Sequence, residues 1–266
     1  LHCMHGLISN YLYCIFYLCS TSLCAFLAIF IFREETYCSC FSNRFYSQSM
    51  DQALSSIVEI NIAKGWFDEY ECQDEVSINL NVNTLVKVLE CWSSGYKLIM
   101  QDNDDKIIVE LYGDSLVSKK FEINKVAVDN EIFNIPEKEY DIDIVLTSDA
   151  FKSIIDELKL FHDTLQIKCD TNSIIMTTAG DEGSASIQIK DGDILEYAVA
   201  LNDGDIFDQK INISKISTCC NINKLNDEVR VHLSNDQPLK VYYSLDSPDY
   251  KGDNSFIRFF IAPKLF

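Results

Sequence analysis

The sequence predicts an α+β fold of short antiparallel strands in two similar halves, each with a helix followed by a run of strands. Apolar and polar residues alternate in runs such as 165–169 and 229–233, which indicates strands with one buried face. Clusters of Asp, Asn and Gly such as 191–193 and 202–205 separate these runs. One stretch, 148–162, instead has the 3.6-residue apolar period of a helix.

The clearest predicted helix is 148–162. Ser148 or Asp149 is expected to cap its first turn, because either side-chain oxygen can accept from the exposed amides there. Its expected buried stripe consists of Phe151, Ile154, Ile155, Leu158 and Phe161. Two shorter helices are expected at 82–92 and 213–220, and the first of them turns Leu85, Val86, Val88 and Leu89 inward.

The first segment differs in composition from the rest of the chain. Residues 1–32 contain no Lys, Arg, Asp or Glu, and a helix over 7–32 is long enough to span a bilayer. The segment has no basic region typical of a secretory signal. Two interpretations stay open: the segment is a membrane anchor, or it is translated non-coding sequence or a gene-model error. The chain also begins with Leu1 rather than Met.

Cysteine use indicates thiols rather than a disulfide or zinc framework. Six of the eleven cysteines lie within the first forty residues, and no C-x-x-C pair occurs there. We expect no zinc site from such scattered spacing. The later cysteines fall in apolar or helical contexts, which is typical of reduced core thiols. They are Cys72, Cys91, Cys169, Cys219 and Cys220.

The net charge excludes one way of binding nucleic acid. The chain has 22 basic and 41 acidic residues, a formal charge of −19. General attraction to phosphates requires basic groups, so a DNA-related function must depend on a local basic surface or on geometry.

No motif predicts catalysis or a bound metal. The Gly-rich stretch 180–184 lacks the Lys-Ser/Thr of a phosphate-binding loop. The acidic run 102–105 is followed by Lys106 and Ile107 where a calcium loop needs a ligand and Gly, so we interpret it as a hairpin turn. The four histidines show no ligand spacing. We therefore expect a protein that is not an enzyme, with no cofactor.

Four segments resemble one family, the proliferating cell nuclear antigens, which are the eukaryotic sliding clamps. They are Gln-Ser-Met-Asp at 48–51, Ile-Phe-Asn-Ile-Pro-Glu-Lys-Glu-Tyr at 132–140, Gln-Pro-Leu-Lys-Val-Tyr-Tyr at 237–243, and Phe-Phe-Ile-Ala-Pro-Lys at 259–264. They occur in the family's order with nearly its spacing. The resemblance covers about residues 38–266.

The resemblance implies a trimeric ring of two-domain subunits, with helices lining the hole and sheets forming the outer wall. It places an atypical apolar leader at 1–37 and domain 1 at 38–117, without its usual first strand and helix. The interdomain connector is expected at 118–138 and domain 2 at 139–266. Two strands are expected at 38–41 and 45–47. The missing first helix puts ring closure by this chain in question.

The family's function implies several partners. The ring encircles double-stranded DNA without reading its sequence and slides along it in the nucleus. It recruits DNA polymerase, a clamp loader and other proteins with short clamp-binding motifs for replication and repair. The partner-peptide pocket is expected to be an apolar hollow walled by Met50, Ile57, Phe133, Ile135, Pro136, Pro238, Phe260, Ile261, Ala262 and Pro263.

The resemblance also assigns DNA-facing and subunit-contact residues. Lys87, Lys152, Lys159 and Lys215 are expected to face the hole, although Glu90 and Asp156 stand where the family has basic residues. Subunit contact is expected between 117–123 and 184–190, with Lys119 and Lys120 facing Asp181 and Glu182. The interface residues are Val117, Lys119, Lys120, Phe121, Ile123, Ser184, Ser186, Gln188 and Lys190.

Two alternatives remain from the sequence. A checkpoint-type clamp subunit would form a hetero-ring, which the good matches at 135–137 and 262–264 argue against. A membrane-anchored β-rich binding protein would require residues 7–32 to be a genuine span.

Overall fold

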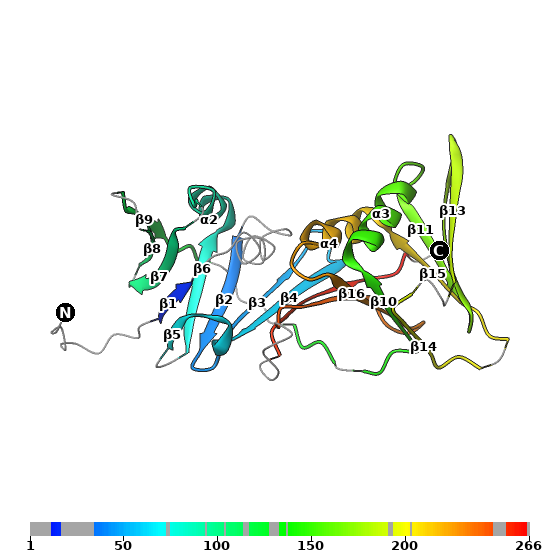
Figure 1. Cartoon of the computed structure of the whole chain (residues 1–266), viewed down its shortest axis with the longest axis horizontal. Helices are drawn as coiled ribbons and strands as arrows, with labels where there is room; N and C mark the ends of the chain where they lie inside the picture. Colours follow the sequence, from blue (N-terminus) through cyan, green and yellow to red (C-terminus); the bar gives the residue numbers. More distant parts are fainter. Residues whose placement is uncertain are drawn as a thin grey trace.

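The computed structural model describes residues 12–16 and 35–264, except 73–74, 94, 104, 114–116, 128–132, 137, 191–193, 203 and 247–253. Side chains are described from residue 37 onward. Within these residues the chain is a succession of antiparallel strands with three α-helices on one side (Figure 1).

Among its described residues, the first half contains nine strands and one α-helix. The strands are β1 Leu12–Phe16, β2 Glu35–Phe41, β3 Arg44–Met50, β4 Ser56–Ala63, β5 Glu69–Cys72, β6 Val76–Asn81, β7 Lys97–Asn103, β8 Lys106–Tyr112 and β9 Lys119–Asn124. The helix α2 is Val82–Leu89, and a short 3₁₀ turn, η1, covers Lys64–Trp66.

The described residues of the second half form nine more strands and two α-helices. The strands are β10 Ile142–Thr147, β11 Thr164–Cys169, β12 Ser173–Gly180, β13 Gly183–Lys190, β14 Glu196–Val199, β15 Phe207–Asn212, β16 Glu228–Leu233, β17 Leu239–Ser244 and β18 Phe256–Ile261. The helices are α3 Ser148–Leu158 and α4 Ile213–Cys219, which continues into the 3₁₀ turn η3 Cys220–Ile222.

The two halves have the same strand order. In the first half, five strands form one sheet in the order β5-β1-β7-β8-β9. The other four are neighbours in a second sheet, in the order β6-β2-β3-β4. In the second half, β14-β10-β16-β17-β18 and β15-β11-β12-β13 repeat both orders nine strands later. The predicted duplicated α+β plan is thus observed as an internal repeat of topology.

One strand pair joins the halves into a single sheet of nine strands. β18 pairs antiparallel with β4, from Phe256 opposite Asn61 to Ile261 opposite Ser56. Beyond the strands, the amide of Ala262 donates to the carbonyl of Ser55 over 2.8 Å. This pairing leaves β9 and β13 as edge strands of the two remaining sheets.

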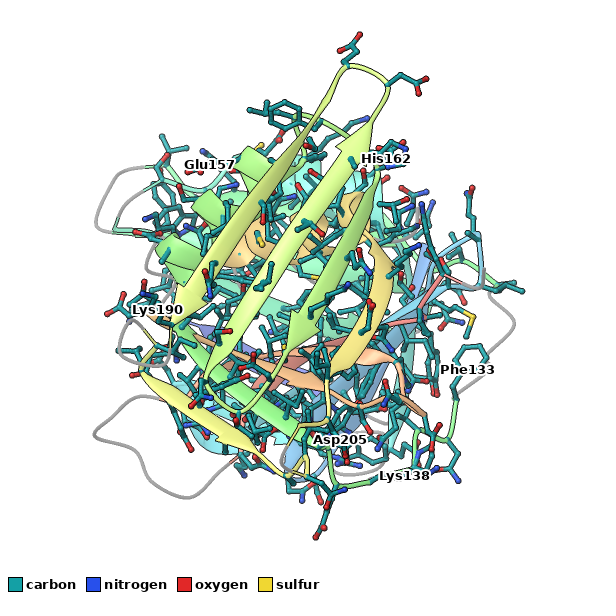
Figure 2. All side chains as sticks on the ribbon, turned by 90° about the vertical axis from the view of Figure 1, so that its right-hand side faces the viewer. Phe133, Lys138, Glu157, His162, Lys190 and Asp205 are labelled. Carbon is teal, nitrogen blue, oxygen red and sulfur yellow. The ribbon has the colours of Figure 1, made fainter. Side chains whose placement is uncertain are left out.

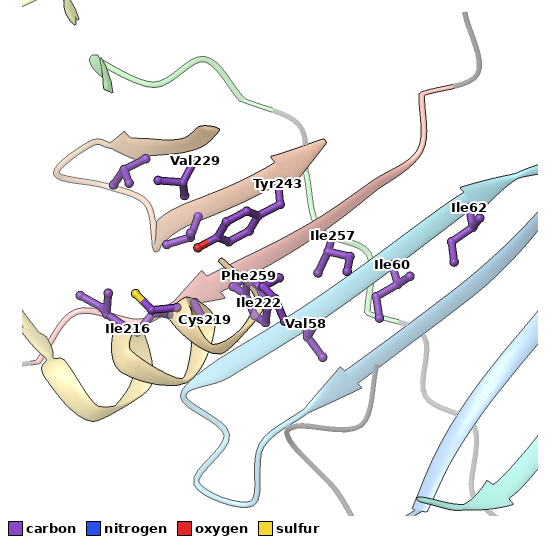
Figure 3. Close-up of a cluster of buried hydrophobic side chains, with 14 of the residues drawn as sticks. Val58, Ile60, Ile62, Ile216, Cys219, Ile222, Val229, Tyr243, Ile257 and Phe259 are labelled. Carbon is purple, nitrogen blue, oxygen red and sulfur yellow. The ribbon is translucent and has the colours of Figure 1, made fainter. Parts of the chain in front are cut away.

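The core lies between these sheets and the helices. Figure 3 shows Phe259 of β18 between Val58 of β4 and Cys219 of α4, and all three side chains are buried. The strands place one residue in two toward this layer. The joint between the halves therefore has a continuous apolar core beneath it.

The helices begin at polar caps that the sequence places at strand ends. The side chains of Asn81, Thr147 and Asn212 accept hydrogen bonds from the first-turn amides of α2, α3 and α4, which satisfies otherwise unpaired donors. The predicted cap at Ser148 or Asp149 is wrong. The hydroxyl of Ser148 instead donates to the carbonyl of Asn226 over 2.6 Å.

The predicted helix 148–162 is also too long, because α3 ends at Leu158. Phe161, expected in the buried stripe, is 40% exposed. A side chain at Gly180 would lie 2.8 Å from the carbonyl oxygen of Phe161. The turn after α3 thus approaches the β12–β13 hairpin closely, and this contact replaces a further helical turn. Predicted helix 82–92 similarly ends at Leu89.

The expectation that domain 1 lacks its first strand is wrong. Residues Leu12–Phe16 form β1, which pairs with both β5 and β7 in the middle of their sheet. The other part of this expectation, that domain 1 lacks its first helix, concerns residues 17–34, which lie outside the described residues. In the described part of the chain, no helix combines the length and the apolar character required to cross a membrane.

The other sequence predictions for this half fare better. Two strands expected at 38–41 and 45–47 are β2 and β3, each longer than predicted. The acidic run 102–105 lies at the β7–β8 hairpin, where Asn103 pairs with Lys106. The predicted connector 118–138 overlaps β9, whose side chains alternate between more and less buried positions as in other sheet strands. The described connector residues therefore begin at Lys125.

The described cysteines are free thiols, as expected. Cys72, Cys169, Cys219 and Cys220 are buried, and Cys91 is partly exposed. Burial raises the pKa of the Cys169 and Cys220 thiols to about 12, because a thiolate is poorly solvated in the core. These thiols act as small apolar side chains.

Phe259→Ala tests the importance of the core beneath the joint. The side chain is fully buried, and its loss leaves a cavity, so we expect the free energy of unfolding to fall by about 3–5 kcal/mol. Denaturant unfolding measures this change. Ile206→Ala, at a residue that is 66% exposed, is the matched control and should change stability by less than about 0.5 kcal/mol. Equal effects would contradict this role of Phe259.

Candidate functional site

A cavity of about 250 Å³ lies between the connector and the nine-stranded sheet. The connector contributes Ile135, Pro136, Lys138 and Tyr140, β17 contributes Lys240, and β18 contributes Arg258 and Phe260. Figure 1 shows the connector running along the side of the molecule opposite the three helices. The cavity thus belongs to the surface that faces away from the helices.

A row of residues across four paired strands forms the floor around this cavity. Met50 of β3 lies opposite Ile57 of β4, and Ile57 lies opposite Phe260 of β18. Phe260 in turn lies opposite Lys240 of β17. Directly paired residues project from the same face of a sheet. The register therefore brings together side chains from both halves of the chain.

Three of the ten residues predicted for the partner pocket line this cavity: Ile135, Pro136 and Phe260. Met50 and Ile57 extend the same row and are half-buried. Ile261 is 1% exposed and belongs to the core, so it does not line this cavity, and its place in the partner pocket stays a prediction. Strand alternation explains the difference, because neighbours on β18 face opposite sides of the sheet.

The other predicted pocket residues lie near the row without lining the cavity. Phe133 and Pro238 are half-buried, at the connector and at the start of β17. Ala262 is exposed and Pro263 is half-buried, in the segment that follows β18.

Side-chain hydrogen bonds hold the connector over the sheet at both ends. The Gln48 amide accepts from the Phe133 amide over 2.6 Å and donates to the Phe133 carbonyl over 3.0 Å. At the other end, the Tyr140 hydroxyl donates to the carbonyl of Pro238 over 3.1 Å. These contacts fix Ile135 and Pro136, which lie between them.

Charged and aromatic side chains pack together at the cavity. The ammonium of Lys240 lies 4.6 Å from the centre of the Tyr140 ring, and the Arg258 guanidinium lies 5.4 Å from that of Phe260. Arg258 also pairs with the buried carboxylate of Glu59. Burial raises the pKa of Tyr140 to about 12, so its hydroxyl is protonated and available as a donor at neutral pH.

The sequence analysis did not predict the polar wall of this cavity. It also did not predict that Gln48 forms hydrogen bonds with Phe133 of the connector. Lys138, Tyr140, Lys240 and Arg258 were not among the predicted pocket residues. The strand signal existed: Lys240 alternates with buried Leu239 and Val241. What the pattern could not supply is the register, which alone places Lys240 beside Phe260.

The same row continues to a half-buried histidine. His232 of β16 lies opposite Lys240 and opposite Asp143 of β10, and its Nδ1 is in contact with the Asp143 carboxylate. Burial, followed by the nearby charge of Lys240, lowers the pKa of His232, while Asp143 opposes this shift. The neutral imidazole is therefore the favoured form in the fold.

A larger cavity, of about 440 Å³, lies over β11, β12 and β15 and contains none of the predicted site residues. It is lined mainly by polar side chains, including His162, Lys210 and Lys264. The Lys264 ammonium donates to the Thr164 hydroxyl over 2.6 Å. Of these two cavities, we regard the smaller one as the candidate partner site because the connector and three residues of the predicted pocket line it.

The four lysines predicted to face DNA lie on the helical side. Lys87 is exposed on α2. Lys152 pairs with Asp156 over 3.0 Å. Lys159 donates to the Ser217 hydroxyl over 3.1 Å. Of these three lysines, Lys152 thus has a neighbouring carboxylate that offsets its charge.

Lys215 has a different role. Its ammonium lies 2.5 Å from the nearly buried Asp51 carboxylate, which links α4 to the loop after β3. Burial opposes the charge of Asp51, but hydrogen bonds from Lys215, Ser55 and Ser56 outweigh it and lower the pKa of this carboxyl. A cation engaged in this way contributes little to phosphate attraction.

The two strands predicted for subunit contact are sheet edges. β9 ends the five-stranded sheet and β13 ends the four-stranded sheet. Figure 2 shows Lys190, at the end of β13, on the opposite side of domain 2 from Phe133 and Lys138 of the connector. The Lys119 ammonium donates to the carbonyl of Cys91 over 2.7 Å, and Lys120 lies 3.4 Å from Glu110.

Among the described residues, no group of three or more His, Cys, Asp or Glu side chains is arranged to hold a metal ion. The site is thus a surface of apolar, aromatic and basic groups.

These features define a class of protein. Two repeats of the same two sheets, joined edge to edge with helices on one side, form the fold of the DNA clamps. The family model "Proliferating cell nuclear antigen, N-terminal domain" matches residues 32–132, and the corresponding C-terminal domain model matches 134–264. The chain belongs to the proliferating cell nuclear antigen family.

Individual relatives are distant but cover most of the chain. Proliferating cell nuclear antigen 2 of Drosophila melanogaster is 28% identical over 229 residues, which are 85% of this chain and 87% of that protein. Proliferating cell nuclear antigen of Saccharomyces cerevisiae is 25% identical over 231 residues, 85% of this chain and 87% of its own length. The Plasmodium falciparum protein named proliferating cell nuclear antigen 1 is 25% identical over 229 residues, 82% of this chain and 84% of its length.

Gln48→Ala tests whether this side chain holds the connector. Losing both hydrogen bonds to Phe133 should raise hydrogen exchange of the Phe133 amide about tenfold. Hydrogen-exchange mass spectrometry of peptides covering the connector measures the rate. Gln52→Ala, at an exposed residue of the β3–β4 loop, is the control. Unchanged exchange in the Gln48 variant would show that the connector is held by other contacts.

A second prediction concerns pH. Because the pKa of His232 is lowered in the fold, the unfolded chain takes up its proton first, near pH 6.5. The free energy of unfolding should therefore decrease as the pH is lowered from 7 to 5.5. This group contributes at most about 1.4 kcal/mol per pH unit to the decrease.

Denaturant unfolding at several pH values measures this slope. His232→Gln should flatten it, whereas His162→Gln, at an exposed position, should leave it unchanged. An identical slope in both variants would contradict the assignment to His232.

Proposed function

We propose that this protein is a DNA sliding clamp, a non-enzymatic ring of three copies that encircles duplex DNA in the nucleus and acts as a polymerase processivity factor. Family membership supports the class of function. The observation that carries the ring is the repeated topology, which leaves two open strand edges equivalent to the two that pair inside the chain.

The repeat supplies a template for subunit contact. β13 occupies the same place in its four-stranded order as β4, and β9 the same place in its five-stranded order as β18. Inside the chain, β4 and β18 pair with each other. We therefore expect β13 of one copy to pair with β9 of the next in the same antiparallel way, which satisfies the unpaired backbone groups of both edges.

The repeat also sets the register. Aligning β4 with β13 and β18 with β9 from their first residues transfers the observed pairing to the subunit contact. It places Ser184 opposite Ile123, Ser186 opposite Phe121 and Gln188 opposite Lys119. These are residues that the family resemblance also assigns to the interface. The same register places Lys119 and Lys120 away from Asp181 and Glu182, so we no longer expect that charge pairing.

Such head-to-tail contacts use two different surfaces, and they close into a ring or continue as a filament depending on the rotation between copies. The family's rings have three subunits. With that closure, α2, α3 and α4 line the hole and the connector lies on the outside.

The charges suit sliding rather than gripping. The helices present Lys87, Lys152 and Lys159, partly neutralised by neighbours such as Asp156. Few phosphate contacts give weak attraction that carries no sequence information. Retention then comes from topology, while the acidic remainder of the molecule repels DNA.

The cavity beneath the connector is the proposed docking site for partners. Family partners insert a short 3₁₀ turn bearing one aliphatic and two aromatic side chains, and the walls formed by Ile135, Pro136 and Phe260 suit such anchors. Bound polymerase, clamp loader and repair proteins are thereby kept near DNA at high effective concentration.

Engineered disulfides test the ring. Phe121→Cys combined with Ser186→Cys should link neighbouring copies under mild oxidation, since directly opposed residues have Cα atoms about 4.5–5.5 Å apart. Non-reducing electrophoresis should show covalent trimers, and light scattering of the wild type should give three times the chain mass.

The control combines Phe121→Cys with Lys190→Cys, four residues out of register, and should give no trimers. Equal cross-linking by both pairs would contradict the register. A wild-type mass of one chain, with trimers appearing only on addition of another protein, would favour a hetero-ring.

Phe260→Ala tests the pocket. Phe260 lines the cavity, so its loss should weaken binding of a partner peptide more than tenfold without preventing trimer formation. Fluorescence anisotropy measures binding and light scattering the mass. Ile135→Ala, on the connector and outside the sheets, should weaken binding with no loss of strand packing. Unchanged affinity in both variants would remove the pocket from the proposal.

A further inference from the structure

The larger of the two cavities has no part in the docking proposal. It has a volume of about 440 Å³ and opens over β11, β12 and β15. Figure 2 shows this sheet in front, with His162 at one end of it. Neighbours of the lining residues, such as Leu165 and Met176, are buried, so the lining side chains point away from the core. We call it the outer cavity; its lining residues are His162, Thr164, Gln166, Thr177, Ala179, Lys210 and Lys264.

The internal repeat identifies the counterpart of this cavity in the first half. β6 and β15 each end at the asparagine that caps the following helix. Two residues before that cap, Asn79 of β6 lies opposite Tyr37 of β2. At the equivalent place, Lys210 of β15 lies opposite Gln166 of β11. Two equivalent rows therefore begin at the edges of the two sheets.

The third position of each row lies on the next strand. On β3, Gln48 continues the row of Asn79 and Tyr37. On β12, Thr177 lies opposite Gln166. Gln48 and Thr177 thus hold equivalent places in the two repeats. The outer cavity corresponds to the surface that Gln48 occupies in the first half.

In the first half, the connector runs along this row. The amide of Val126 donates to the carbonyl of Asn79 over 3.1 Å. The side chain of Gln48 then holds the backbone of Phe133 through two hydrogen bonds. Both contacts are made to the backbone of the connector rather than to its side chains, so this surface binds an extended chain with little regard to its sequence.

In the second half, the segment after β18 repeats only the first of these contacts among the described residues. The amide of Lys264 donates to the carbonyl of Lys210 over 2.8 Å. Thr177 lines the outer cavity instead of holding a backbone segment. Two residues further along β12, Ala179 stands where β3 has Met50. The smaller side chain leaves room, so the surface that the connector covers in one repeat is a cavity in the other.

The lining suits a peptide backbone better than a large apolar side chain. The hydroxyls of Thr164 and Thr177 and the amide of Gln166 can each donate and accept hydrogen bonds. The Lys264 ammonium donates to the Thr164 hydroxyl over 2.6 Å, and Gln166 donates to Asp208 over 2.7 Å. None of the seven lining residues has a large apolar side chain. An extended backbone, which presents donors and acceptors in turn, matches these groups.

We propose that the outer cavity binds an extended peptide segment of a partner protein, which runs from β15 to β12 as the connector runs from β6 to β3. Thr177 and Gln166 hold the backbone of this segment, as Gln48 holds that of the connector. The inference goes beyond the proposed docking function and does not depend on the pocket beneath the connector. The proposed subunit contact uses the edge of β13, whereas the cavity lies over the other strands of that sheet.

A synthetic peptide with the connector's own sequence, residues 125–136, is the probe for the full chain. The tethered connector keeps its own place because its effective concentration is high. We expect saturable binding of the labelled peptide by fluorescence anisotropy. Thr177→Gln, which introduces the side chain of the first half, should tighten binding about fivefold, the scale of one added hydrogen bond.

A second variant closes the cavity. Ala179→Met introduces the larger side chain of the first half at an exposed position and should weaken binding at least about fivefold. The same two changes at exposed residues outside the cavity, Thr171→Gln and Ala198→Met, should leave the affinity unchanged. Thermal unfolding of each variant controls for misfolding.

The outcomes separate this inference from its alternatives. Binding that ignores both Thr177→Gln and Ala179→Met would place the peptide elsewhere and overturn the inference, as would no binding to the wild type or to Thr177→Gln. Displacement by inorganic phosphate, but not by sodium chloride of equal ionic strength, would assign the cavity to an anion instead. Loss of binding as the protein concentration rises would assign it to a second copy. A chain that binds the peptide but remains a monomer would contradict the ring and leave this inference in place.

Discussion

The pairing of β4 with β18 is the constraint on which the rest of the structure depends. It turns two separate repeats into one molecule with a nine-stranded sheet and places Phe260 beside Ile57, so the floor of the partner cavity comes from both halves. The pairing also occupies one strand edge of each repeat, that of β4 in the first and that of β18 in the second. The edges that remain, β9 and β13, occupy the places of β18 and β4 in their repeats, and we propose that subunits pair through them in the same way.

Much of this fold could be predicted from the sequence, because alternation and turn residues are local signals. The strands of domain 2 and helices α3 and α4 follow from their apolar period, although Thr147 caps α3 in place of Ser148 or Asp149. Helix ends were less accessible: α3 stops at Leu158 because the next turn meets the β12–β13 hairpin at Gly180, a tertiary contact. β1 was missed because an uncharged leader reads equally well as a membrane span.

The candidate site was predictable only in part. Ile135, Pro136 and Phe260 were identified through family resemblance, and they do line the cavity. Ile261, expected beside them, lies in the core, since resemblance does not say which face of a strand a residue occupies. Lys240 and Tyr140 meet only through strand register and the path of the connector, and the Lys215 ammonium is paired with Asp51. The contacts of Lys240 and Lys215 join distant segments, which a single sequence does not encode locally.

The central claim is that an acidic protein serves DNA by enclosing it, and retention on DNA tests this most directly. The chain is loaded by its clamp loader onto a nicked circular plasmid, and the complex is isolated at a salt concentration that abolishes simple electrostatic binding. We predict that the protein stays on the circle and is released when the plasmid is cut once to give free ends. Equal retention on circular and linear DNA, or loss from both, would contradict topological enclosure.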